Sequence, residues 1–143
     1  MNKYNIIFDR YKEYVESNSI YKPRTVKTNT NTSAYFPIIN CYLFDNPILD
    51  KTTKNIEKFE KFYFTIDIYA KDIIQGNKKI PAQVILDELI GLTYNFFENG
   101  LNMDRSLSKP TPNIDTGVLR HTIQYECTIN NRGNIIRRWN NEF

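Results

Sequence analysis

The feature that most constrains this fold is an alternation of residue types from Phe62 to Ala70. Every second residue is apolar, and each residue between carries a hydroxyl or a carboxyl group. Successive side chains of a β-strand point to opposite faces of the sheet, so this pattern predicts a strand with one buried face. We expect Phe62, Phe64, Ile66, Ile68 and Ala70 on the buried face, and Tyr63, Thr65, Asp67 and Tyr69 on the other.

A second long strand is predicted from Gly117 to Ile129, where the same period of two recurs. The dense apolar run Ala34–Phe44 predicts another strand, with Pro37 indicating an edge position or a bulge. Leu101–Ser108 is a weaker strand candidate. On the strand over 117–129, one face would hold Leu119, His121, Ile123, Tyr125, Cys127 and Ile129, and the other Arg120, Thr122, Gln124 and Glu126.

Two segments have helical periodicity. Tyr4–Glu16 places its aromatic and aliphatic residues on one side of a helical wheel, which predicts a short amphipathic helix. Pro81–Asn99 has a broader apolar stripe, with Pro81 suited to the first turn and Gly100 suited to a C-terminal cap. We expect this stripe to cover the sheet.

The remaining segments are predicted to be connections. Ser17–Ser33 is polar and basic and is expected to be one long loop, and Ile48–Lys58 another. Gly76 and Asn77 mark a turn. The segment 131–143, which includes Ile135–Trp139, is expected to form a short C-terminal arm or strand.

These elements predict an α+β fold in one domain spanning residues 1–143. The order is helix, strand, strand, helix, strand, strand (αββαββ), and successive strands joined by loops favour an antiparallel four-stranded sheet with the helices packed on one face. A length of 143 residues suits one domain.

Composition excludes several classes of protein. No apolar run is long enough to span a bilayer, and the first residues lack the apolar segment of a signal peptide, so we expect the protein to be located in a cytoplasm. The net charge of +3 is mild compared with that of dedicated nucleic-acid binders. The two cysteines, Cys41 and Cys127, have no metal-ligand spacing and are expected to be buried thiols. No metal or cofactor is expected.

A search for catalytic residues points away from an enzyme. The glycine-rich phosphate-binding motifs and the G-x-S-x-G motif do not occur. The one histidine, His121, lies on the apolar face of its strand and is expected to be structural. The remaining enzymatic alternative is a carboxylate pair formed by Asp67 and Glu126, whose strands place both on a polar face.

A nucleic-acid-binding module is a further alternative. It would use the basic segment Ser17–Ser33 together with a C-terminal arm that combines cationic residues with an aromatic ring. The residues of that arm are Arg137, Arg138 and Trp139.

The motifs together resemble a known family. A basic polar segment leads into Tyr35-Phe36-Pro37-Ile38-Ile39, and Phe62–Lys71 follows; after the second helix, Pro112-Asn113-Ile114-Asp115 precedes Leu119–Tyr125. This order and spacing over roughly residues 20–130 resemble the tail terminator proteins of long-tailed phages of Gram-positive bacteria, also called tail-completion or minor capsid proteins.

The resemblance implies a non-enzymatic virion protein, assembled in the host cytoplasm. Its subunits would form a ring, typically hexameric, that ends the tail tube and docks to the neck, with the tail tube protein, the neck connector and transient DNA as partners. Another neck, connector or head-completion ring is the alternative. Because tyrosine and arginine are favoured at interfaces, the candidate interface residues are Tyr35, Tyr63, Tyr69, Arg120, Tyr125, Arg137, Arg138 and Trp139.

Overall fold

The computed structural model describes residues 3–27, 35–45, 48–50, 59–112, 117–130 and 135–136. Helical structure is formed by α1 (Lys3–Asn18), α2 (Ala82–Tyr94) and the π-helical turn η1 (Asn95–Gly100) that continues α2. The strands are β1 (Arg24–Val26), β2 (Ile38–Asp45), β3 (Ile48–Asp50), β4 (Phe59–Ala70), β5 (Ile73–Gln75), β6 (Lys78–Ile80), β7 (Asp104–Thr111), β8 (Leu119–Asn130) and β9 (Ile135–Ile136).

The protein is α+β, but its sheet contradicts the prediction of four antiparallel strands. Five strands form a mixed sheet in the order β1-β2-β4-β8-β7, in which β1 runs parallel to β2 and the other pairs are antiparallel. The short strands β3 and β9 add to β4 and β8, and β5 pairs with β6 in a separate two-stranded sheet. The αββαββ order is therefore wrong as well.

Short strands account for most of this difference. The segment Ser17–Ser33, predicted to be one loop, begins with the end of α1 and contains β1, whose three residues are too few for a period of two. Likewise β3 lies inside the predicted loop Ile48–Lys58. A β-hairpin, β5–β6, surrounds the expected turn at Gly76, whose φ of 63° suits glycine.

Two predicted boundaries also shift. Strand β7 runs on to Thr111, because Pro110 lies on the outer strand of the sheet, where a missing N–H group is tolerated. The second helix ends at Gly100 as π-helix, and the left-handed residue after it is Asn102 (φ 58°) rather than the predicted cap Gly100. Pro81, predicted to lie in the first turn, is instead the N-cap residue that directly precedes α2.

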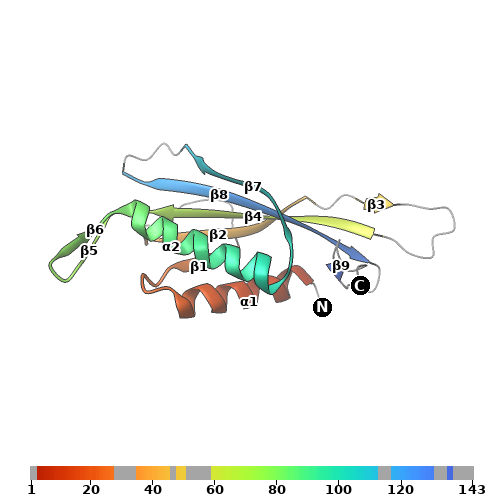
Figure 1. Cartoon of the computed structure of the whole chain (residues 1–143), viewed down its shortest axis with the longest axis horizontal. Coiled ribbons are helices and arrows are strands. Elements are labelled where there is room, and N and C mark those ends of the chain that lie inside the picture. Colours follow the sequence, from red (N-terminus) through yellow and green to blue (C-terminus); the bar gives the residue numbers. More distant parts are fainter. Residues whose placement is uncertain are drawn as a thin grey trace.

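Both helices cover the same face of the sheet (Figure 1). The largest buried cluster joins α1 and α2 to that face and includes Ile66, Leu89 and Ile123, each with no exposed surface. Cys41 and Cys127 are buried in the same cluster, which confirms that prediction. Neither helix of the described chain is long and apolar enough to cross a membrane.

Aromatic packing fixes the two helices to the sheet. The ring of Tyr4 from α1 stacks on Phe64 of β4 with 5.7 Å between centroids, and the Tyr11 hydroxyl lies 2.8 Å from the Thr93 hydroxyl of α2. Phe97 of η1 stacks on Tyr125 of β8 at 4.8 Å. Aromatic side chains of α1 and of η1, which continues α2, thus attach the helical layer to β4 and β8.

Candidate interaction surface

The sheet face opposite the helices is mainly polar, and Asp67 lies at its centre. We call this the polar face; it includes Asn40, Tyr42, Thr65, Asp67, Tyr69, Arg120, Thr122 and Gln124, from β2, β4 and β8. Asp67 is fully buried in the middle of β4. A buried carboxylate requires compensating hydrogen bonds or an ion pair, because burial removes its hydration.

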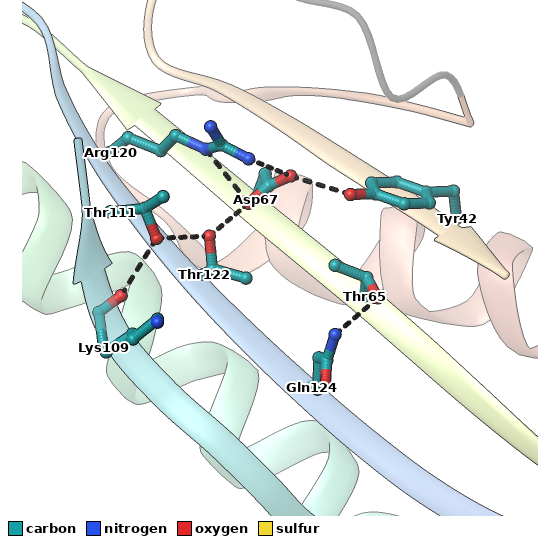
Figure 2. Close-up of polar contacts among 8 residues, drawn as sticks. All are labelled: Tyr42, Thr65, Asp67, Lys109, Thr111, Arg120, Thr122 and Gln124. Carbon is teal, nitrogen blue, oxygen red and sulfur yellow. Dashed lines mark hydrogen bonds and ion pairs between the residues drawn. The ribbon is translucent and has the colours of Figure 1, made fainter. Parts of the chain in front are cut away.

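Arg120 supplies the ion pair. Its Nε and Nη2 atoms lie 3.2 and 3.1 Å from the two carboxylate oxygens of Asp67, in a two-pronged contact (Figure 2). Only 1% of the Asp67 side chain is exposed, against 27% for Arg120. The guanidinium also lies over the ring of Tyr69, 5.5 Å from its centroid, at the position directly across the ladder. Arg120 thus contacts two neighbouring residues of the polar face.

Hydroxyl groups complete the shell around Asp67. Thr122, directly opposite on β8, donates a hydrogen bond to Oδ1, and Tyr42 of β2 donates to Oδ2 at 3.1 Å. Thr122 in turn accepts a hydrogen bond from Thr111 of β7 at 2.6 Å (Figure 2). Burial and the neighbouring Asp67 raise the pKa of Tyr42 to about 12, so this phenol remains a donor at physiological pH. Four strands are connected through one carboxylate.

The structure does not form the predicted carboxylate pair of Asp67 and Glu126. The ladder places Glu126 opposite Tyr63 and Asp67 opposite Thr122. The two acids are therefore separated by four positions along the strands, or roughly 13 Å. Asp67 is bound by Arg120 rather than by an acid.

His121 lies on the helix-covered face, in a chain of hydroxyl contacts. Its Nε2 is 2.8 Å from the Ser108 hydroxyl of β7, which is 2.7 Å from the Tyr94 hydroxyl at the end of α2. Burial lowers the pKa of His121, and Asp87 partly offsets this, so the ring is neutral at physiological pH. Among the described residues, no carboxylate hydrogen bonds to Nδ1 of this ring. The contacts thus tie α2 to the sheet, as expected of a structural histidine.

A pocket of about 290 Å³ opens beside this histidine, between the start of α2, the end of β7 and the start of β8. Apolar side chains make up much of its wall, and Arg120, the one cation among the described residues that line it, is held by Asp67. No group of three or more potential metal-ligating side chains occurs in the described ranges. The pocket-lining residues include Leu86, Pro110, Val118, Leu119 and His121.

The predicted interface residues are distributed over several places. Tyr69, Arg120 and Tyr63 share the polar face, whereas Tyr125 lies in the core, where its hydroxyl donates to Glu98. Tyr35 is 48% exposed and donates a hydrogen bond to the Lys22 carbonyl at 2.7 Å. The remaining three, Arg137, Arg138 and Trp139, lie outside the described residues.

Sequence reasoning missed the most exposed apolar side chain of the described chain. Ile74, in the β5–β6 hairpin, is 77% exposed, and Val84 on α2 is 47% exposed. The signal was present, because two isoleucines precede the predicted turn at Gly76 and a third follows it. That pattern is typical of a hairpin.

No protein-family model matches the sequence, and no curated protein matches it.

Proposed function

We propose that this protein is a tail terminator of a long-tailed phage or prophage, a structural subunit that forms a ring on the head-proximal end of the tail tube. The order of sequence motifs around one central helix supports the family. The observation that carries the proposal of self-association is the β5–β6 hairpin, which extends beyond the end of the main sheet (Figure 1) and exposes Ile74.

An exposed isoleucine on an extended hairpin favours contact with another protein. Large apolar side chains in contact with water cost free energy that docking recovers. A closed ring needs two different patches on each subunit, one for each neighbour, and a projecting element is suited to be one of them.

The polar face supports a structural rather than a catalytic role. Its central carboxylate is fully engaged by Arg120, Thr122 and Tyr42. A rigid, hydrogen-bonded face presents the same surface in each copy, as a repeated assembly requires.

The test is assembly of phage tails without this protein. We expect tails of abnormal length that do not join heads, viewed by electron microscopy after deletion of the gene. Labelled protein should be found at the head-proximal end of complete tails. Tails of normal length that join heads would overturn the proposal, and label on the head vertex would instead indicate another neck ring.

A further inference from the structure

We propose that helix α1 closes one edge of the main sheet against the addition of a further strand. Three of its side chains, Tyr4, Lys12 and Glu16, bind the backbone groups that such a strand would use. The inference goes beyond the proposed function, because it concerns the sheet edge of one chain rather than its place in a phage tail.

The main sheet has two edges, β1 on one side and β7 on the other. An edge strand presents backbone N–H and C=O groups that can pair with another chain, and proteins protect such edges. Strand β7 has protection within its own sequence, because its pairing with β8 has a bulge between Arg105 and Leu107, and Lys109 and Pro110 follow. Strand β1, Arg24–Val26, has neither a bulge nor a proline, so its protection beyond its short length comes from elsewhere.

The outward backbone groups of β1 belong to Thr25. Along a strand, the N–H and C=O groups of successive residues point alternately to its two edges. The Arg24 N–H donates to the Pro37 carbonyl at 3.1 Å, so the backbone groups of Arg24 point toward β2. Those of Thr25 therefore point away from β2, to the outer edge of the sheet.

Two side chains of α1 bind these outward groups. Glu16 Oε2 accepts a hydrogen bond from the Thr25 N–H at 3.0 Å, and Lys12 Nζ donates to the Thr25 carbonyl oxygen at 3.4 Å. Lys12 and Glu16 also form an ion pair at 2.8 Å, one helical turn apart. The pair thus offers Thr25 one acceptor and one donor, as a residue of a neighbouring strand would.

A third side chain of α1 binds the edge just beyond the end of β1. Cys41 and Pro37 are four residues apart, so their carbonyl groups point to the same edge of β2. The Tyr4 hydroxyl donates to the Cys41 carbonyl at 3.0 Å. One side of α1, which lies beside β1 (Figure 1), therefore follows the edge. The residues of that side recur every four positions and are Tyr4, Phe8, Lys12 and Glu16.

The strand that α1 excludes is an extended segment of a second copy. Every copy carries the same edge, and opened edges expose the same donors and acceptors in extended conformation. Main-chain hydrogen bonds are sufficient to join such edges, and the pairing has no built-in end. Because Thr25 and Cys41 are bonded to α1 within one chain, pairing through this edge requires the helix contacts to break first.

Hydrogen exchange tests the contact at one amide. In Glu16→Ala the Thr25 N–H loses its acceptor, so in dilute protein this amide should exchange at least about tenfold faster than in the native chain. In concentrated protein the same amide should become protected again, and sedimentation should show species larger than those of the native protein, because Thr25 pairs with another copy. Glu13→Ala, which removes an exposed acid from the same helix, is the control and should change neither measurement.

Two results of this experiment would overturn the inference. One is equal exchange of the Thr25 amide in Glu16→Ala and Glu13→Ala. The other is a Glu16→Ala protein whose assemblies, when it is concentrated, match those of the native protein in size.

A second variant keeps the test decisive should Glu16→Ala fail to fold. Tyr4→Phe combined with Lys12→Ala removes two donors from the edge but keeps the stacked ring of residue 4. Tyr14→Phe combined with Arg10→Ala makes the same two changes on α1, where the Tyr14 hydroxyl contacts η1 instead. We expect binding of thioflavin T that grows with protein concentration in the first double variant only. Equal dye binding by the two would contradict closure of the edge by α1.

Discussion

The guanidinium of Arg120 reaches diagonally across the β4–β8 ladder to hold the carboxylate of Asp67, two positions from its own partner Tyr69. The pair joins two neighbouring strands of the sheet, β4 and β8. A buried ion pair makes the fold depend on both partners, because removal of one leaves the other without compensation.

We therefore expect Asp67→Asn to destabilise the protein by about 3 kcal/mol, measured as the free energy of unfolding in urea. Asp9→Asn, the same change on the exposed side of α1, is the control and should stay within about 0.5 kcal/mol. An Asp67→Asn protein as stable as the control would show that the ion pair contributes nothing.

The core under α2 should be sensitive to cavities. Leu89 and Ile66 have no exposed surface, so Leu89→Ala and Ile66→Ala should each cost about 2 to 5 kcal/mol in unfolding free energy. Ile20→Ala removes an aliphatic side chain that is 63% exposed and should change stability little. Similar losses in all three variants would contradict the packing described for this core.

Stability should fall on mild acidification because of His121. Burial lowers its pKa in the folded chain, so the unfolded chain binds the proton more readily. The contribution of this ring is complete above the ordinary histidine pKa of about 6.5 and is lost as the pH falls through and below that value. Urea unfolding at pH 7.5 and 5.5 should show a smaller pH effect for His121→Gln than for the native protein. An unchanged pH effect would exclude His121 as the cause.

The contacts of Asp72 with Ala82 and Lys79, at the base of the β5–β6 hairpin, should control local opening of that hairpin. In Asp72→Ala, which loses the contacts with Ala82 and Lys79, the amides of β5 and β6 should exchange hydrogen faster than in the native protein. Asp9→Ala is the control. The Ala82 N–H and Lys79 lower the pKa of Asp72, so the folded carboxylate stays ionised down to its ordinary pKa of about 3.9. The protection of these amides, taken relative to the intrinsic exchange rate at each pH, should fall only below that value. Equal hydrogen exchange in Asp72→Ala and Asp9→Ala would show that the Asp72 contacts are not needed to hold the hairpin closed.

Both cysteines should be unreactive in the folded protein. Burial raises the pKa of Cys41 and of Cys127 to about 12, so almost no thiolate exists at pH 8. We expect no rapid reaction with a thiol reagent at that pH, and reaction of two thiols per chain in denaturant. Rapid labelling without denaturant would show that one of these sites opens.

The sequence predicted the elements in which one face is buried. In β4 the apolar residues from Phe64 to Ala70 do meet the helices, because a period of two reports which side of a strand is covered. The same signal located β8 and its buried residues Ile123 and Tyr125. The helical stripe of α2 was equally informative, as Ile85 and Leu89 are buried against the sheet.

The sequence could not predict the sheet as a whole. Strand β1 has three residues, and its parallel pairing with β2 depends on the path of the chain rather than on local pattern. The partners of Asp67 were missed for a related reason. The acid was matched with Glu126 because both lie on polar faces, whereas the register of the ladder brings Thr122 and Arg120 to it. Register is a tertiary property, and a shift of a few residues changes every neighbour.

The pairing of β4 with β8 also bears on the order of events during synthesis. Phe59 pairs with Asn130 and Ala70 with Leu119, so the central ladder joins residues from the middle of the chain to residues near its end. A nascent chain that stops before Leu119 lacks Arg120 and Thr122, which bind Asp67. It also lacks β8, the strand that pairs with one edge of β4. Synthesis of β8 therefore precedes closure of the central ladder, and the polar face around Asp67 is complete only after residues 119–130 have left the ribosome.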